Sequence, residues 1–404
     1  MIIEPKIRGF ICTTAHPQGC AEHVREQIAF VRAKRPIQGV KNALVIGSST
    51  GYGLASRITA AFGANAGTIG VCFEKPASGN RTASAGWYNT AAFEIEAKAH
   101  GVMARTINGD AFSDAVKEET IAAIREECGQ VDLVIYSLAS PRRVHPRTGE
   151  TFSSVLKPVG RSFTSKTVNV QSGVVTEVTL DPATQDDIRN TVAVMGGEDW
   201  NLWIEALDQA GVLAQGATTT AYSYVGPELT YAIYREGTIG RAKDDLEDTA
   251  LTLDARMELS GGRAFVSVNK AVVTQSSSAI PVVPLYIALL FRVMKERGLH
   301  EGCIEQMYRL FAERVYSDGP VSVDDRGRAR MDDWEMRSDV QAVVSELWQR
   351  AQTGGLTDIA DLDGYREDFL KLFGFGFRGV DYDADVDPDV PILSVAPIED
   401  AARH

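Results

Sequence analysis

The stretch GSSTGYG, residues 47–53, decides the fold because of its neighbours on both sides. The apolar run NALVI (42–46) precedes it, and LASRITAAF (54–62) follows it. The first run is typical of a buried strand and the second of a helix, so the three glycines lie in a strand-to-helix turn. Two interpretations compete: a tight turn that binds nothing, and a loop whose backbone and helix N-terminus hold a phosphate.

The pattern around this turn repeats. Apolar strands alternate with amphipathic helices over about residues 40–140, which predicts parallel β-α-β units with helices on both faces of a sheet. We therefore expect an α/β fold of Rossmann type, doubly wound and mostly parallel, with a substrate-side insertion and N- and C-terminal additions. The whole chain, 1–404, is expected to form one enlarged domain. In it, 40–140 and 235–275 are the cofactor-binding core, 141–234 the insertion and 276–404 a helical and C-terminal addition.

Composition narrows the function classes. The net charge of −13 argues against a broad basic surface for nucleic acid or anionic lipid. The longest nearly apolar run, 279–291, is shorter than the roughly 20 residues that span a bilayer. Five scattered cysteines and six histidines give no disulfide or metal pattern, and the acidic run 381–389 is better explained as a solvated turn than as a calcium loop. We expect a cytoplasmic protein without signal peptide, metal, nucleic-acid partner or membrane segment.

The end of the second expected strand indicates the cofactor. Phe73 and Glu74 end this strand, and Glu74 lies 21 residues after Gly53. A carboxylate at about this spacing accepts hydrogen bonds from the adenosine ribose and repels a 2′-phosphate, so NADH is expected in preference to NADPH. The alternative is a solvated glutamate at a strand end. The third and fourth strands end in Asp110–Ala111 and Leu138–Ala139, small residues that suit either a ligand crevice or close packing.

A cluster of tyrosines lies further along the chain. Residues 221–247 contain Tyr222, Tyr224, Tyr231 and Tyr234, followed by Lys243. On composition alone, an aromatic packing cluster explains them equally well. For catalysis, a phenol with a pKa near 10 needs help at neutral pH, and a neighbouring ammonium lowers that pKa. Tyr234 and Lys243, with eight residues between them, are the candidate pair.

The spacing of this pair sets a geometric condition. Residues nine apart lie on roughly opposite sides of a straight helix, because an α-helix turns by about 100° per residue. Gly237, Thr238 and Gly240 stand between the two and supply a loop and an N-cap. We predict that Lys243 lies in the first turns of the following helix and that Tyr234 lies before it, with both side chains directed to the same crevice.

Five stretches together resemble a known family over nearly the full chain: MIIEPKIRGFICTTAHPQGC, GSSTGYG, YSLASPRR, TYAIYREGTIGRAKDDLE and NKAVVTQSSSAIP. They resemble the FabV/TER-type trans-2-enoyl-ACP and trans-2-enoyl-CoA reductases, which are short-chain dehydrogenase-like. The resemblance implies an oxidoreductase that uses NADH to reduce the trans-2 double bond of enoyl thioesters, a step of fatty acid biosynthesis. The implied partner is a thioester on acyl carrier protein (ACP) or CoA, and a monomer is expected.

The same resemblance assigns roles to individual residues. Tyr234 matches the proton donor, Lys243 an NAD-contacting residue and Tyr224 a substrate contact. The positions that match cofactor contacts are Gly47, Ser48, Ser49, Thr50, Gly51, Tyr52, Phe73, Glu74, Asp110, Ala111, Leu138, Ala139, Lys243, Val272, Val273 and Thr274.

Two rival functions keep the fold and change the role. A ketone or alcohol dehydrogenase of the short-chain type has its tyrosine and lysine four apart, and the tyrosine cluster contains no such pair. A non-catalytic NAD(H) sensor would need neither residue. Two further features stay open: 279–291 suits an acyl-chain wall or a buried core helix, and Arg142 with Arg143 suits carrier phosphates or a solvated surface pair.

Replacing Glu74 tests the cofactor assignment. Glu74→Ala is expected to weaken NADH binding and to improve the relative use of NADPH, because an attraction to the ribose and a repulsion of the 2′-phosphate disappear together. The measurement is kcat/KM for each cofactor in the wild type and the variant. An unchanged ratio of the two values would contradict a selecting role for Glu74.

Overall fold

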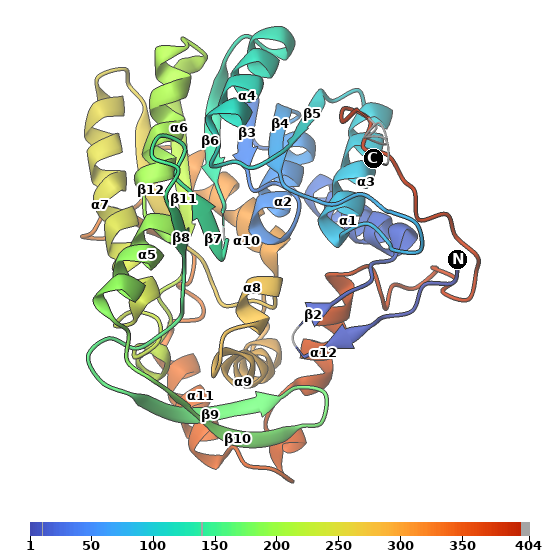
Figure 1. Cartoon of the computed structure of the whole chain (residues 1–404), viewed down its shortest axis with the longest axis vertical. Helices are drawn as coiled ribbons and strands as arrows, with labels where there is room; N and C mark the ends of the chain where they lie inside the picture. Colours follow the sequence, from blue (N-terminus) through green and yellow to red (C-terminus); the bar gives the residue numbers. More distant parts are fainter. Residues whose placement is uncertain (10, 139, 397–404) are drawn as a thin grey trace.

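A seven-stranded sheet forms the centre of the protein, in a computed structural model that describes residues 1–9, 11–138 and 140–396 (Figure 1). The strand order is β13-β12-β11-β6-β3-β4-β5, and every neighbouring pair is parallel. This order reverses between β3 and β6, as in a doubly wound sheet, so the predicted fold class is confirmed. The strands are β3 (Asn42–Ile46), β4 (Gly67–Cys72), β5 (Ala104–Asn108), β6 (Val131–Tyr136), β11 (Leu213–Ser223), β12 (Arg263–Val268) and β13 (Arg328–Arg330).

Helices cover both faces of the sheet, because successive strand residues point to opposite faces and both sets are apolar. One face packs Ala43 and Val45 of β3 against four helices, and the other packs Leu44 and Ile46 against three. The first set is α1 (Pro17–Arg32), α2 (Gly51–Ile58), α3 (Ala85–Ala99) and α10 (Cys303–Arg309). The second set is α4 (Asp114–Glu127), α6 (Glu198–Gln209) and α7 (Thr238–Glu258).

A third apolar cluster lies beyond the carboxyl ends of the strands. Its centre is α9 (Val283–Glu296), in which eleven of fourteen residues are buried. The segment 279–291 therefore contributes a buried core helix, one of the two expected interpretations. Around α9 lie α8 (Gln275–Ser278), α11 (Ser338–Arg350), α12 (Leu362–Lys371) and the hairpin of β9 (Phe163–Asn169) and β10 (Val174–Leu180).

The pattern of KTVNVQSGVVTEVTL, residues 166–180, predicts this hairpin, and the attachment of Lys166 to α11 holds it across the helices. The Lys166 ammonium donates to the carbonyls of Trp348, Gln349 and Ala351, at 3.0 Å each. These carbonyls lie at the end of α11, where donors four residues further along the helix are lacking, so the lysine caps that helix. The shorter elements of this region are β7 (Arg142–Val144), β8 (Thr151–Ser153) and α5 (Gln185–Met195), and β1 (Ile7–Arg8) pairs with β2 (Ile11–Cys12) in the N-terminal arm.

The structure differs from the expected boundaries in the segment 141–234. Strand β11 and helix α6 lie inside this segment, yet both belong to the sheet layers rather than to an insertion. Strand β13 likewise joins the sheet from within the expected C-terminal addition. Arg143 is also not a surface residue: its side chain is 1% exposed and donates to the Ala193 carbonyl and to Glu198.

The N-terminal residue lies beside the C-terminal segment of the chain (Figure 1). The amino group of Met1 donates to the carbonyl of Val386 at 2.6 Å. Trp87 and Tyr88 of α3 donate to the carbonyls of Val390 and Pro388, at 2.7 Å each. The acidic run 381–389 is therefore held between the N-terminal residue and α3 at its carboxyl end.

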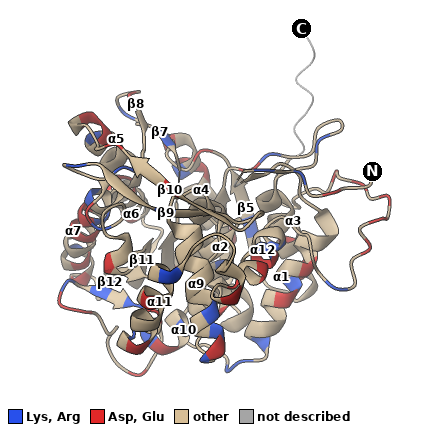
Figure 2. Ribbon diagram, turned by 90° about the horizontal axis from the view of Figure 1, so that it is seen from below, with Lys and Arg blue, Asp and Glu red and all other residues tan. Residues whose placement is uncertain are grey.

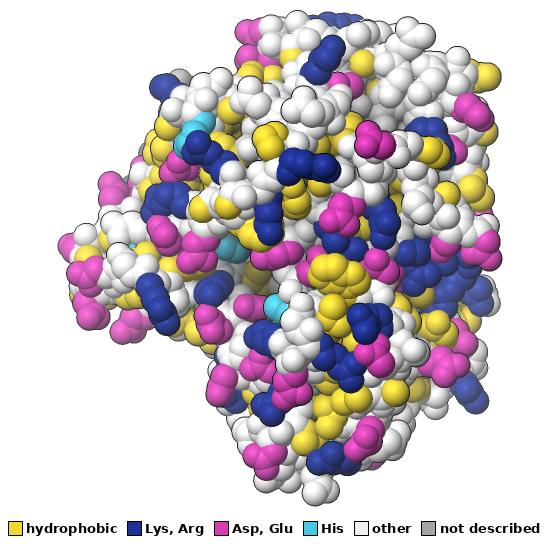
Figure 3. All heavy atoms as spheres, turned by 180° about the vertical axis from the view of Figure 1, so that it is seen from behind, with side chains coloured by type: hydrophobic (Ala, Val, Ile, Leu, Met, Phe, Trp, Pro, Cys, Tyr) yellow, Lys and Arg dark blue, Asp and Glu magenta, His cyan; other side chains and the backbone are white. Residues whose placement is uncertain are grey.

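Charges of both signs are interspersed over the outer helices and over the rear face (Figures 2 and 3). On these faces, neither sign of charge dominates (Figures 2 and 3). In the described part of the chain, no helix combines the length and apolar character needed to cross a membrane.

Substitution of Gly53 tests how tightly the strand-to-helix turn is closed. A Cβ atom at Gly53 would lie 1.8 Å from the Gly47 carbonyl oxygen, so Gly53→Ala is expected to displace the turn and to lower the melting temperature. At Gly51 the nearest atom to an added Cβ is 3.8 Å away, but φ is +54°. Gly51→Ala is thus the matched control, because it introduces backbone strain without a steric clash. We expect it to lower the free energy of unfolding by about 1 kcal/mol. Thermal unfolding that ranks Gly51→Ala as the more damaging change would contradict this packing.

Candidate active site

The glycine turn leaves the start of α2 open. Thr50 stands at the N-cap of α2, and its side chain makes no capping hydrogen bond. The first backbone N–H groups of a helix have no partner inside it, so an uncapped start offers donors to an anion. Gly51 borders open space, where an added Cβ would reach only the Thr274 methyl group. A turn that is closed at Gly53 and open at Gly51 fits the pyrophosphate of a dinucleotide.

The expected cofactor residues gather at one edge of the sheet. Glu74 follows β4, and its two carboxylate oxygens accept from the hydroxyls of Ser49 at 2.6 Å and Ser84 at 2.5 Å. Phe73 beside it is 77% exposed, an unusual position for a phenylalanine and one suited to contact with an adenine ring. Ala111 follows β5, and its carbonyl is held by Lys117 and Trp203.

The remaining residues of this set also border the turn or the strand ends. Leu138 lies within reach of Gly47, Tyr52 donates to the Lys270 carbonyl at 2.7 Å, and Thr274 caps α8. The set at the C-terminal edge is Gly47, Ser48, Ser49, Thr50, Gly51, Tyr52, Phe73, Glu74, Asp110, Ala111, Leu138, Val272, Val273 and Thr274. Ala139 lies outside the described residues. Contact of these residues with a cofactor stays a prediction.

Tyr234 and Lys243 are arranged as the spacing requires. Helix α7 begins at Thr238, so Lys243 lies in its second turn and Tyr234 precedes it, in turns after Glu228–Thr230. The N-cap is Gly237 rather than Thr238. The two residues do not lie on one unbroken helix. This separation was the geometric condition for their cooperation.

Two glycines make this arrangement possible. An added Cβ at Gly237 would lie 2.4 Å from the Ile233 carbonyl oxygen, and one at Gly240 would lie 2.4 Å from the Tyr234 carbonyl oxygen. The turn that carries Tyr234 is therefore folded directly against the start of α7. A side chain at either glycine would force the turn that carries Tyr234 away from the helix that carries Lys243.

The electrostatics of the pair differ from the expectation. Burial, together with the charge of Glu335, raises the pKa of Tyr234 instead of lowering it. Lys243 does not counter this rise, because its ammonium donates to the Tyr222 carbonyl at 3.2 Å and its own pKa is lowered by burial to about 8. The prediction that Lys243 lowers the Tyr234 pKa was wrong. Tyr234 is a neutral phenol and therefore a hydrogen-bond donor.

Tyr224 lies against Tyr234 but does not have a free hydroxyl. The two rings meet edge to face, with centroids 4.8 Å apart and an interplanar angle of 81°. The Tyr224 hydroxyl donates to Glu335 at 3.0 Å, whereas the Tyr234 hydroxyl has no hydrogen-bond partner among the described residues. Sequence reasoning missed Glu335, since a glutamate 111 residues from its tyrosine partner carries no local signal.

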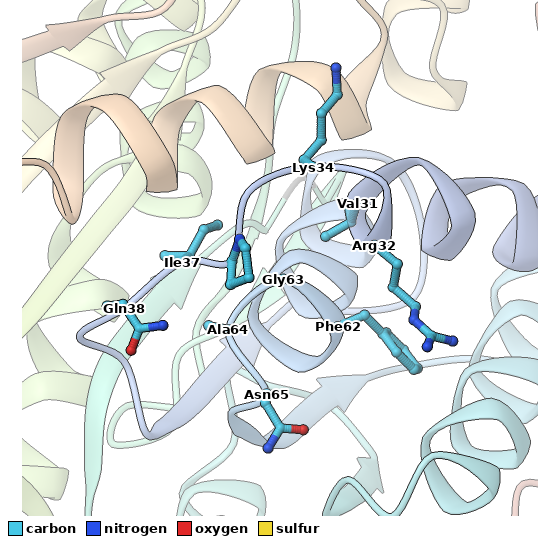
Figure 4. Close-up of a pocket in the computed structure, with 10 residues that line it drawn as sticks. Val31, Arg32, Lys34, Ile37, Gln38, Phe62, Gly63, Ala64 and Asn65 are labelled. Carbon is cyan, nitrogen blue, oxygen red and sulfur yellow. The ribbon is translucent and has the colours of Figure 1, made fainter.

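Figure 4 shows a separate surface hollow, which is not part of this site. It is lined by residues at the end of α1 and before β4, among them Arg32, Gln38 and Asn65. These residues precede β3 and β4 in the chain, so they lie near the amino ends of these strands, at the opposite edge of the sheet from Tyr234. None of the predicted site residues lines it.

Together, the Rossmann sheet, the glycine turn and the tyrosine–lysine pair at one edge define a dinucleotide-dependent reductase. Family models confirm and narrow this class. The model for the trans-2-enoyl-CoA reductase catalytic region matches residues 81–316, and that for the family's NAD(P)H binding domain matches 2–79. The chain belongs to the trans-2-enoyl-CoA reductase family.

Individual relatives agree over nearly the whole chain. An enoyl-[acyl-carrier-protein] reductase [NADH] from Flavobacterium johnsoniae is 62% identical over 98% of this chain and 100% of its own. A protein of the same name from Coxiella burnetii is 59% identical over 98% of this chain and 99% of its own. The crystal structure of Treponema denticola trans-2-enoyl-CoA reductase in complex with NAD matches with 50% identity and a TM-score of 0.93, covering 97% of this chain and 100% of that one.

A third family model, described as an enoyl reductase FAD binding domain, matches residues 323–386. In this segment, Val340 and Val344 of α11 and Tyr365 and Phe369 of α12 are buried in the cluster around α9. These side chains fill the space between the helices, and the residues do not fit a flavin site. No step of the reaction is assigned to FAD.

The lowered pKa of Lys243 predicts a pH dependence of cofactor binding. Its charged form exists below about pH 8, so NADH affinity is expected to fall as the pH rises through about 8. The measurement is the Kd for NADH by fluorescence titration between about pH 6 and pH 10. Lys243→Arg, whose guanidinium stays charged, should give a flat curve. A Kd for NADH that does not change with pH in the folded wild type would contradict a contact between Lys243 and the cofactor.

Proposed function

We propose that this protein reduces the trans-2 carbon–carbon double bond of enoyl thioesters with NADH and releases the saturated acyl thioester. The observation that carries the proposal is the uncommitted hydroxyl of Tyr234, held beside Tyr224 at the edge where the cofactor turn opens. Family membership over nearly the full chain supports the same reaction.

The residues divide the chemistry between them. When bound, NADH supplies the hydride that adds to the β-carbon of the substrate. Negative charge then develops on the thioester oxygen, and the Tyr234 hydroxyl donates a hydrogen bond to that oxygen where the charge appears. Its raised pKa keeps the proton on the phenol at neutral pH. A proton that comes ultimately from water adds at the α-carbon, so that one hydride and one proton complete the saturated product. Lys243 supplies a positive charge for the cofactor.

The carrier and the acyl chain follow from neighbouring features. We infer that the substrate is carried on ACP in fatty acid biosynthesis, since relatives of about 60% identity have the name enoyl-ACP reductase. Helix α9 and the Tyr224–Tyr234 pair belong to one apolar cluster, which supports α9 as a wall for the acyl chain. The cytoplasmic location and the monomeric state stay predictions.

Turnover with crotonyl-CoA tests the reaction. The wild type should oxidise NADH in its presence, followed by the cofactor's absorbance. Tyr234→Phe should lower turnover by roughly two to three orders of magnitude, the usual scale for loss of such a donor, with NADH affinity unchanged. Tyr231→Phe, in the same turns, is the matched control and should stay near the wild type.

The rival functions give different results in the same assay. Reduction of ketones without activity on crotonyl-CoA would favour the short-chain dehydrogenase, and NADH binding without turnover of any thioester would favour the sensor. Near-normal turnover in Tyr234→Phe would place the donor elsewhere.

A further inference from the structure

A buried carboxylate lies directly behind the tyrosine pair. Glu335 precedes α11 and is fully buried, with 0% exposure. Its Oε1 atom accepts from the hydroxyls of Tyr224 at 3.0 Å and Tyr286 at 2.6 Å, and its Oε2 atom accepts from the backbone N–H of Ala271 at 2.7 Å. One side chain thus joins the end of β11, helix α9 and the start of the segment that contains Val272, Val273 and Thr274.

The surroundings keep Glu335 in place and suit its ionised form. Gln341 donates to the Glu335 carbonyl at 2.7 Å and to the Tyr286 hydroxyl at 3.1 Å. Three donors converge on the carboxylate, which an ionised carboxylate can accept in full. Burial raises the pKa of Glu335, and the nearby Lys270 charge, the Tyr286 hydroxyl and the Ala271 N–H oppose that rise.

This arrangement determines which tyrosine has a proton to donate. A phenol has one proton, and that of Tyr224 is directed to Glu335. The Tyr234 hydroxyl has no such partner among the described residues, although its ring touches that of Tyr224. The two tyrosines therefore differ: the Tyr224 hydroxyl already donates its proton to Glu335, and the Tyr234 hydroxyl is able to donate to another group.

We propose that Glu335 is a positioning residue for the reduction: by taking the Tyr224 proton, it fixes the Tyr224 ring against Tyr234 and leaves Tyr234 as the donor to the thioester oxygen. This inference rests on the proposed function. It assigns Glu335 no contact with the substrate, since its effect passes through the Tyr224 hydroxyl.

Glu335→Gln is the informative change because it preserves size. A glutamine has one oxygen and one NH₂ group, and the oxygen must face the Ala271 N–H to avoid two opposed donors. Its NH₂ group then faces the two phenols. The Tyr224 hydroxyl becomes an acceptor there, and its released proton is able to bond the Tyr234 oxygen or the substrate oxygen in competition with Tyr234.

A double-mutant cycle measures this effect. The four proteins are the wild type, Glu335→Gln, Tyr224→Phe and the double variant, and the readouts are kcat with crotonyl-CoA, the Kd for NADH and thermal unfolding. Glu335→Gln should lower kcat by about tenfold in the wild type, and by less than about twofold when Tyr224 is already Phe. NADH affinity should not change. Tyr286→Phe, which removes the other phenol from the same oxygen, is the matched control with less than about a twofold effect.

The outcomes separate this inference from the function beneath it. An equal loss of kcat in both backgrounds, or no loss from Glu335→Gln in the wild type, would overturn the positioning role while the active wild type leaves the proposed function standing. An inactive wild type would overturn both. If Glu335→Gln does not fold, Glu335→Asp takes its place in the cycle, since it keeps the charge and shortens the reach to Tyr224, with the same outcomes deciding.

Discussion

All strands of the central sheet run in one direction, and this constraint brings the ends of seven strands to a single edge. Connections at that edge must turn sharply into helices, and the turn after β3 does so only because Gly53 packs against the Gly47 carbonyl. The same edge receives Glu74, Ala111, Leu138 and Thr274 from segments far apart in the sequence. The residues expected to bind the cofactor are therefore brought together by the direction of the strands rather than by their own interactions.

Burial is the second constraint, and it shifts the pKa values of the two catalytic candidates in opposite directions. Removal from water disfavours each charged form, so the pKa of Tyr234 rises and that of Lys243 falls to about 8. The pair is thus not a phenolate stabilised by an ammonium. Tyr234 is a neutral phenol, and the Lys243 side chain donates to the Tyr222 carbonyl.

Local patterns in the sequence predicted the sheet, the hairpin and the break before α7, because each depends on residues near one another. The two strands that were not predicted have no such pattern: β11 includes Gly216 and three threonines, and β13 is only Arg-Ala-Arg. Both are strands because of the neighbours that they pair with. The contact of Glu335 with Tyr224 and the raised pKa of Tyr234 both depend on burial between segments that are distant in the sequence. No spacing in the sequence predicts such burial.

The commitment of the Tyr224 proton also limits what this residue can recognise. With its proton directed to Glu335, the Tyr224 oxygen can only accept a further hydrogen bond. A thioester oxygen is an acceptor, so it suits the Tyr234 hydroxyl, which still has a proton to donate. Because the proton of one phenol is already donated and that of the other is not, the two adjacent phenols need not compete for one oxygen.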